Sequence, residues 1–293
     1  RWGMVLGEEV RAARNWTRRD AAKHANAELR GVLVTPRWSD AEVLEALEQL
    51  QPGECSALAG RFLADCAGEA LVAGSVTPAE AEAVAAAVAS AAAGGAELPW
   101  APARSGGSEQ RVVGLPAPLV TRAASNPNDS GASAASRDSA LVWYVQCDRP
   151  SGGLGGAERR ACLQLLCKLA AKPCFHALRT VEKLGYAVSL SQARYHAVLG
   201  LAVAVQSPVA SASEVAARVE AFLVGLRGTL EALPEEDVRV AAAALAAQKM
   251  EPPKTLWAAG EEMWLELSAL RFDWGLRGRE AAWLEHGASR EAL

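Results

Sequence analysis

Arg179 and Tyr186 are the two side chains whose types and spacing most clearly suit chemistry on a peptide bond. A guanidinium presents a fork of N–H donors that can hold a peptide carbonyl. A phenol can donate a hydrogen bond to the oxyanion that develops during hydrolysis. The structural alternative is an arginine that caps or bridges helices and a tyrosine that packs at the end of a sheet. Residue types alone leave both interpretations open.

The elements that must position this pair are a helix and the strand that follows it. Apolar residues recur every three positions along the expected helix, at Phe175, Leu178, Val181 and Leu184. Gly185 fits the position just past a helix end, where left-handed backbone geometry costs glycine little. From Tyr186 onward, apolar and small residues alternate as on a strand. Arg179 and Tyr186 therefore flank a helix-to-strand corner, where both can point into a cavity beside the sheet.

The histidines and cysteines form no recognisable metal or redox motif. No histidine has a second histidine four residues away, as the zinc motif H-x-x-E-H requires; the four are His24, His176, His196 and His286. No two cysteines are spaced as C-x-x-C; the six are Cys55, Cys66, Cys147, Cys162, Cys167 and Cys174. We therefore expect no metal site in this chain, and we expect reduced, mostly buried thiols of an intracellular protein.

A glycine-rich loop at 152–156 precedes an expected helix, an arrangement that can cradle phosphate. The loop lacks the pattern G-x-x-x-x-G-K-S/T, and it fits G-x-G-x-x-G poorly. We interpret it as a flexible loop, so a nucleotide-binding module is the weaker alternative for the function of the chain.

Composition limits the partners that we expect for the chain and its expected location in the cell. The formal net charge of the 293-residue chain is −4 and no long basic run occurs, so we expect no nucleic-acid partner. No apolar run reaches the roughly 18 residues that a membrane-spanning helix needs, so we expect no membrane association. Nothing near Arg1 resembles a signal peptide, and we expect a cytoplasmic protein. A start without Met suggests a truncated sequence, which leaves mitochondrial, peroxisomal or plastid targeting open.

The order of elements predicts an α+β protein of two domains. A composition break at 94–108, rich in glycine and proline, reads as the linker between them. Before the break we expect helices at 37–50, 58–63 and 78–93 and a strand at 67–75. After it we expect strands at 111–115, 141–147, 186–191 and 195–206, and helices at 157–171, 235–249, 254–270 and from Ser211 onward. A polar insertion at 125–139 should form an exposed loop.

Several local signals support these elements. Capping pairs of serine or threonine with glutamate begin three of the helices, at Ser39 and Glu42, Thr77 and Glu80, and Ser211 and Glu214. The strand at 195–206 should pair back on the strand at 186–191 as a hairpin. In each domain we expect helices packed on one face of a mostly antiparallel sheet.

Segments along most of the chain resemble, in order, the C-terminal half of the pitrilysin, insulysin and nardilysin family of zinc metallopeptidases. They are PRWSDAEVLEALE at 36–48, EALVAGSVT at 69–77, PCF at 173–175, LRT at 178–180, LGY at 184–186, RVEAFL at 218–223 and KMEPPKTL at 249–256. The resemblance implies that 1–98 is the C-terminal part of the third domain of that family and that 99–110 is a linker. It implies that 111–293 is the fourth domain without its last helix and strand, so that both domains are incomplete.

The resemblance also implies an activity. The full-length enzyme would be an insulysin-like metalloendopeptidase that hydrolyses peptides with Zn²⁺ held by H-x-x-E-H in an N-terminal half. This segment lacks that motif and should be inactive alone. Its implied partners are peptide substrates and the zinc-bearing half, on the same or a separate chain, and a homo-oligomer is left open. The alternative is a non-catalytic scaffold or core subunit of the same superfamily, which would have no reason to keep an oxyanion donor.

Two pairs of residues match functional positions of the family. Arg179 and Tyr186 match positions that reach across the chamber to the substrate, which implies substrate binding for both and oxyanion donation for Tyr186. Cys167 and Cys174 match two cysteines at the same spacing and could make the enzyme sensitive to thiol reagents. Buried, inert thiols are the alternative for these two residues.

Overall fold

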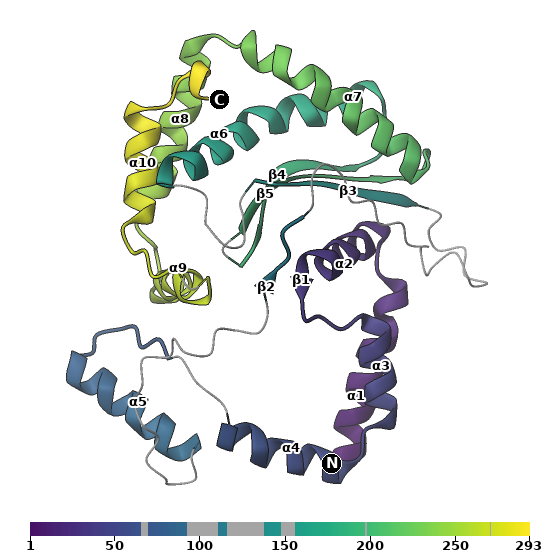
Figure 1. Cartoon of the computed structure of the whole chain (residues 1–293), viewed down its shortest axis with the longest axis vertical. Helices are drawn as coiled ribbons and strands as arrows, with labels where there is room; N and C mark the ends of the chain where they lie inside the picture. The colour runs from purple at the N-terminus through teal and green to yellow at the C-terminus, as the bar shows by residue number, and fades with distance from the viewer. Residues whose placement is uncertain (66–69, 93–110, 116–137, 148–155, 197, 270) are drawn as a thin grey trace. The chain divides into compact units, whose positions relative to one another are not determined.

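The computed structural model describes residues 1–65, 70–92, 111–115, 138–147, 156–196, 198–269 and 271–293 (Figure 1). The helices are α1 (Trp2–Arg14), α2 (Ala21–Leu33), α3 (Asp40–Gln49), α4 (Pro52–Asp65), α5 (Pro78–Ala92), α6 (Gly156–Phe175), α7 (Ala212–Glu231), α8 (Glu235–Met250), α9 (Leu256–Ser268) and α10 (Leu276–His286). The strands are β1 (Val34–Thr35), β2 (Arg111–Val112), β3 (Ser139–Gln146), β4 (Ala187–Tyr195) and β5 (Val198–Ser207). The fold is α+β, as predicted, and mostly helical.

The chain forms two compact units, each made of separate segments. The first comprises the described parts of Arg1–Trp16, Trp38–Glu109 and Pro253–Ser268. The second comprises the described parts of Thr17–Arg37, Gln110–Pro252 and Ala269–Leu293. The linker expected at 99–110 lies outside the described residues, and the domain limits 1–98 and 111–293 stay a prediction.

A three-stranded antiparallel sheet in the order β3-β5-β4 is the centre of the second unit. The hairpin predicted from the sequence is confirmed as the pair of β4 and β5, whose register runs from Ala187 opposite Gln206 to Tyr195 opposite Val198. Alternation along β5 turns one set of side chains to a buried face, as predicted: Leu199, Leu201, Val203 and Val205.

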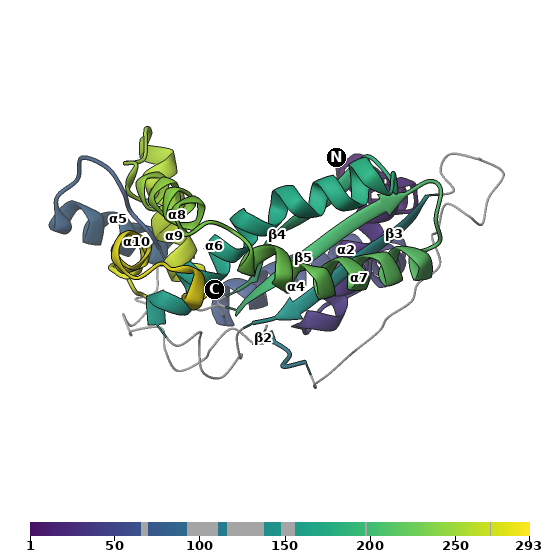
Figure 2. The ribbon, with the colours of Figure 1, turned by 90° about the horizontal axis from the view of Figure 1, so that it is seen from above.

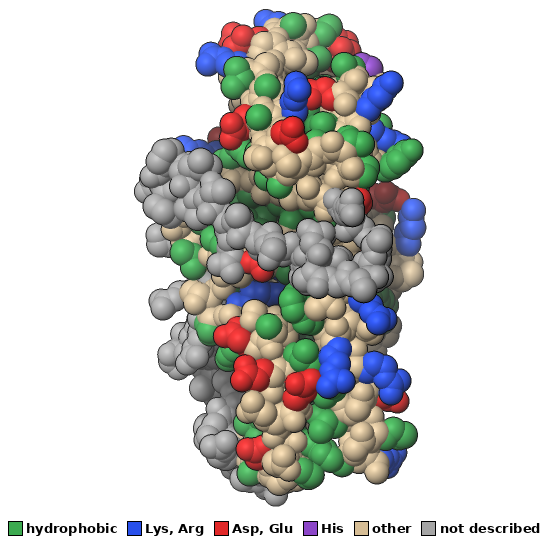
Figure 3. Space-filling model, turned by 90° about the vertical axis from the view of Figure 1, so that its right-hand side faces the viewer, with side chains coloured by type: hydrophobic (Ala, Val, Ile, Leu, Met, Phe, Trp, Pro, Cys, Tyr) green, Lys and Arg blue, Asp and Glu red, His purple; other side chains and the backbone are tan. Residues whose placement is uncertain are grey.

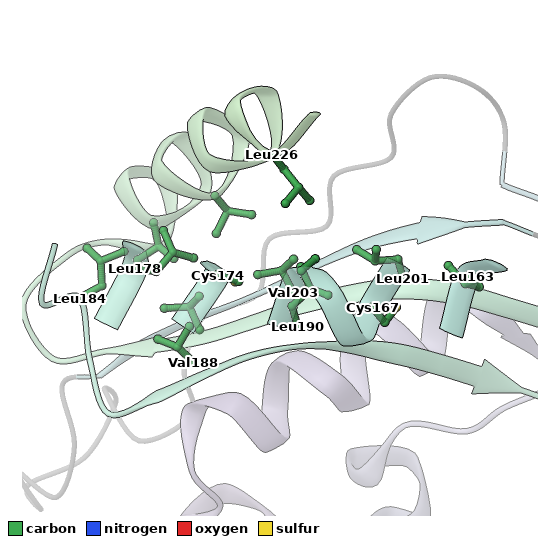
Figure 4. Packing of buried hydrophobic residues seen from close by; sticks show 14 of the residues in the cluster. Leu163, Cys167, Cys174, Leu178, Leu184, Val188, Leu190, Leu201, Val203 and Leu226 are labelled. Carbon is green, nitrogen blue, oxygen red and sulfur yellow. The ribbon is translucent and has the colours of Figure 1, made fainter. Parts of the chain in front are cut away.

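Helices α6 and α7 cover this buried face (Figures 1 and 2). The Ser211 hydroxyl accepts a hydrogen bond from the backbone N–H of Glu214, and the Glu214 carboxylate accepts from the N–H of Ser211, so the predicted capping box begins α7. Val215, Val219 and Leu226 of α7 are buried against the sheet. Figure 4 shows leucines, valines and two cysteines of α6, α7 and the strands meeting in this core.

Helix α2 packs against β3 and β5 from the opposite face, which the sequence analysis did not predict (Figure 1). The N–H of Ala22 donates to the Gln206 side-chain oxygen at 3.3 Å, and the Gln206 amide donates to Asp138 at 2.7 Å. Since Gln206 alternates with the buried Val205, its side chain lies on the second face of the sheet. This part of the sheet is therefore covered on both sides.

In the first unit the described residues form helices. The predicted capping boxes begin α3, at Ser39, and α5, at Thr77. The strand expected at 67–75 is wrong for residues 70–75, which pair with no described strand. The backbone there bends at Gly74, whose φ of +153° departs from strand geometry. The strand expected at 111–115, which lies in the second unit, is shorter than predicted, because only Arg111 and Val112 pair, with β1 of the same unit.

Helix α10, which the sequence analysis did not delimit, packs on α6 and α8 through a second apolar cluster. Glu280 of α10 is buried beside this cluster and pairs with two cations. Its carboxylate lies 3.1 Å from Nε of Arg160 on α6 and 2.5 Å from Nζ of Lys249 on α8. One carboxylate therefore links three helices.

The surface carries charges of both signs. Acidic and basic side chains lie interspersed on the face shown in Figure 3, in keeping with the small net charge. Within the described ranges, every helix is too short or too polar to cross a bilayer.

Candidate functional site

The corner that carries Arg179 and Tyr186 begins where α6 changes its winding. The α-helix continues through Pro173 to Phe175, and a π-helical turn then spans His176–Val181. The N–H of Glu182 donates to the carbonyl of Ala177, five residues earlier, at 3.0 Å. The expectation that this stretch forms an ordinary helix up to Leu184 is therefore wrong. π-Helical turns inside α-helices occur frequently at functional sites.

Gly185 is needed for a different reason than the sequence suggested. The residue with left-handed geometry is Lys183, with a φ of +55°, so the assignment of that role to Gly185 is wrong. A Cβ on Gly185 would lie 2.0 Å from the carbonyl oxygen of Gln206 in β5. Glycine is required because the backbone that enters β4 passes directly against β5.

Gly185→Ala should therefore destabilise the protein by about 1–3 kcal/mol or more, because a backbone atom of the sheet would have to move. Gly225→Ala in α7 is the matched control, since a Cβ there meets nothing within 4 Å. That control should leave stability unchanged or raise it by about 0.5–1 kcal/mol, the usual difference between glycine and alanine in a helix. Denaturant midpoints of the two variants check the prediction, and equal midpoints would contradict it.

Arg179 and Tyr186 lie together at this corner. The guanidinium carbon of Arg179 is 5.7 Å from the centroid of the Tyr186 ring and 4.6 Å from that of Phe175. Arg179 is half-buried, and the Tyr186 side chain is 85% exposed. The structure thus brings the two predicted site residues side by side, with the phenol facing solvent.

Among the described residues, neither side chain has a hydrogen-bond partner of the kind that the structural alternative requires. In the described part of the chain, no carbonyl or carboxylate accepts a hydrogen bond from Arg179, and the Tyr186 hydroxyl has no hydrogen-bond partner. Tyr186 is too exposed to be a packing residue. The donors of both side chains are therefore available to a ligand.

Phe175 is a residue of this site to which the sequence assigned no role beyond its place in the apolar repeat. It is 39% exposed, and its ring contacts the Arg179 guanidinium. The spacing of four residues between an aromatic and an arginine was the signal that could have revealed the contact, because side chains at that spacing share a helix face.

Cys167 and Cys174, by contrast, are buried in the core between α6 and the sheet (Figure 4). Burial, with a smaller effect of the nearby Cys147 thiol, raises the pKa of Cys167 to about 12. Burial alone raises the pKa of Cys174 to about 11. Because the thiolate is the reactive form, both residues should be weak nucleophiles at neutral pH.

We therefore expect Cys167 and Cys174 to react slowly with iodoacetamide while the chain is folded. Relative to an ordinary cysteine, these pKa values lower the thiolate fraction by about 100-fold for Cys174 and 1,000-fold for Cys167. Exposed Cys147 is the internal control. Peptide mass spectrometry after timed labelling gives the three rates. Native labelling of Cys167 or Cys174 as fast as that of Cys147 would show that these thiols are sensitive in the way the resemblance implied.

No group of three or more histidine, cysteine, aspartate or glutamate side chains is placed to hold a metal ion within the described ranges. The groups that the corner itself offers for chemistry are hydrogen-bond donors. An arginine fork and a phenol can bind a carbonyl and stabilise a developing negative charge.

Comparison with known proteins gives the families and structures that this chain is similar to. A family model described as PQQ synthase PqqF-like, C-terminal lobe domain 4, matches residues 165–264, which include the corner. The chain is 31% identical to the insulin-degrading enzyme of Homo sapiens over 142 residues, 48% of this chain and 13% of that protein. It is 24% identical to the insulin-degrading enzyme of Drosophila melanogaster over 271 residues, 92% of this chain and 26% of that protein.

Two further similarities agree. A putative zinc protease of Caenorhabditis elegans is 32% identical over 130 residues, 44% of this chain and 15% of that protein. The crystal structure of pitrilysin superposes with a TM-score of 0.74 at 19% identity, over 99% of this chain and 29% of that one. The fold is therefore pitrilysin-like, and the chain spans about a quarter or less of the curated relatives that it matches.

Proposed function

This chain belongs to the pitrilysin and insulin-degrading enzyme family, in its C-terminal domain region, and from this premise we propose a role in peptide hydrolysis. The chain would form the C-terminal, non-zinc half of an insulysin-like intracellular metalloendopeptidase. In that role it encloses short, unfolded peptides and positions them for cleavage.

The observation that carries the proposal is the corner formed by Arg179 and Tyr186. An arginine and a tyrosine lie beside each other, with hydrogen-bond donors that no described residue uses. Arg179 is only half-buried, so water can accept hydrogen bonds from these donors when no peptide is bound. A substrate carbonyl could replace that water, a role for which a scaffold subunit has no need.

The two side chains have different tasks in this proposal. Arg179 donates to a carbonyl oxygen of the bound peptide and fixes the orientation of its backbone. Tyr186 donates its phenolic proton in a hydrogen bond to the oxygen that becomes negatively charged as the carbonyl carbon is attacked. When bound in the other half, Zn²⁺ would activate the attacking water. The described residues of this chain form no group of three or more candidate ligands that fits zinc, and in this proposal the N-terminal half would hold the ion.

The coding sequence upstream of Arg1, and the protein that it encodes, test the proposal. We expect an in-frame H-x-x-E-H motif, or a second gene that carries it. The complete enzyme should then contain about one zinc per active site, while residues 1–293 alone should contain far less than one after dialysis. Tight, near-equimolar zinc in residues 1–293 would contradict the proposal. Absence of any zinc-bearing half would favour the scaffold alternative.

A further inference from the structure

We infer that Phe175 is a positioning residue that holds the Arg179 guanidinium ready for a peptide ligand. This inference rests on the proposed function, and it adds a residue that had no assigned role at this site. Phe175 itself needs no contact with the peptide.

The Phe175 ring and the Arg179 guanidinium are in contact. The guanidinium carbon of Arg179 lies 4.6 Å from the Phe175 ring centroid, closer than its 5.7 Å from the Tyr186 centroid. Cations within about 6 Å of an aromatic centroid are attracted by the negative face of the ring. Arg179 is thus held by two rings, of which Phe175 is the nearer.

Contact with the aromatic rings leaves the N–H donors of the Arg179 guanidinium free to bind a ligand. A guanidinium that lies over an aromatic ring uses its flat face, while its N–H donors point outward in its plane. A carboxylate partner would occupy those donors instead. The ring therefore restricts the motion of a long side chain without consuming the hydrogen bonds that a peptide carbonyl needs.

Glu182 is the acidic residue nearest to Arg179 in the sequence, three positions after it, and its charge could neutralise the guanidinium. Its carboxylate instead lies 3.6 Å from Nε of Arg218 on α7. The acid that could have neutralised Arg179 is thus engaged elsewhere, and the aromatic contact remains the means of holding the guanidinium.

Phe175 lies at the surface. The residue is 39% exposed, and it belongs to neither of the two buried apolar clusters among the described residues. Its ring centroid lies 4.6 Å from the guanidinium carbon of Arg179, four residues further along the chain. A partly exposed ring at this distance from a guanidinium fits a positioning role.

Two measurements on residues 1–293 test the inference. Side-chain NMR of Arg179 reports the ring contact, because a proton over an aromatic face is shifted upfield. Fluorescence anisotropy reports the affinity for a fluorescein-labelled unfolded decapeptide. Phe175→Leu keeps an apolar side chain and removes the ring, so the Arg179 Hδ and Hε signals should move downfield. Peptide affinity should fall by about 2–5-fold, the size of an exposed cation–π contact.

Three variants complete the design. Phe175→Tyr restores a ring and should keep both the Arg179 shifts and the peptide affinity. In an Arg179→Ala background, Phe175→Leu should change peptide affinity no further, because the ring acts through the arginine. Phe222→Leu on α7 is the matched control for a lost ring and should leave the Arg179 shifts unchanged.

The outcomes separate this inference from the proposed function. Unmoved Arg179 signals in Phe175→Leu would overturn the inference. Moved signals with unchanged peptide affinity would also overturn it, provided that Arg179→Ala does weaken the peptide. Unchanged affinity in Arg179→Ala would overturn the proposed substrate role of the arginine itself, whatever the NMR signals show.

Discussion

Tyr186→Phe should lower the turnover of the complete enzyme by about 100- to 1,000-fold, the usual cost of losing one oxyanion donor. The substitution removes one hydroxyl and almost no volume. Because Tyr186 is 85% exposed and its hydroxyl has no partner among the described residues, stability should not change. Measured kcat, KM and thermal midpoint of both proteins give the answer. A kcat/KM within about threefold of wild type, or about 0.65 kcal/mol, would remove Tyr186 from the mechanism.

Two further variants sharpen this prediction. Tyr195→Phe is the matched control, because Tyr195 lies at the far end of β4 and packs edge-on against Tyr144. It should leave kcat unchanged. Arg179→Ala should raise KM through the loss of peptide binding, and it should lower kcat as well if the contact tightens in the transition state. Neither site variant should change the zinc content of the complete enzyme.

Glu280→Ala should destabilise the second unit by about 3–5 kcal/mol, the usual cost of removing one partner of a buried ion pair. The Glu280 carboxylate is buried between Arg160 of α6 and Lys249 of α8, and its loss leaves the buried Arg160 and the part-buried Lys249 without this counter-charge. Urea unfolding followed by circular dichroism measures the change. We expect the apparent stability to fall while the content of helix before unfolding stays the same.

Glu285→Ala in the same helix is the control for this prediction. Glu285 lies 3.8 Å from the exposed imidazole of His286, and surface pairs of this kind contribute about 0–1 kcal/mol. The helix and the type of substitution are the same, whereas the burial of the carboxylate and its charged partners differ. Equal losses for Glu280→Ala and Glu285→Ala would show that the buried network does not hold α10 to α6 and α8.

Local signals in the sequence predicted the elements that depend on neighbouring residues. The capping box of Ser211 and Glu214 involves positions three apart, and the hairpin of β4 and β5 is closed across a tight connection. In both cases the interacting groups lie close in sequence, so the pattern of residue types carries the information. The placement of Arg179 and Tyr186 on one corner followed from the same short-range reasoning.

Features that depend on distant residues could not be predicted in this way. The requirement for Gly185 comes from the carbonyl of Gln206 on another strand. The pairing of Glu280 with Arg160 joins residues that are 120 positions apart in the sequence. The continuation of α6 through Pro173 also went against local preference, since proline usually ends a helix. Each of these features depends on tertiary packing, and a single sequence does not show tertiary packing directly.

The most direct test of the central claim is peptide hydrolysis by two separately expressed halves. Residues 1–293 would be mixed with a zinc-bearing N-terminal half, encoded upstream or supplied by a family member, and assayed on a short unfolded peptide. We predict no hydrolysis by residues 1–293 alone and clear hydrolysis by the mixture. Hydrolysis by the mixture should fall strongly when residues 1–293 carry Tyr186→Phe. Hydrolysis by residues 1–293 alone, or a mixture no more active than the zinc-bearing half by itself, would contradict the account.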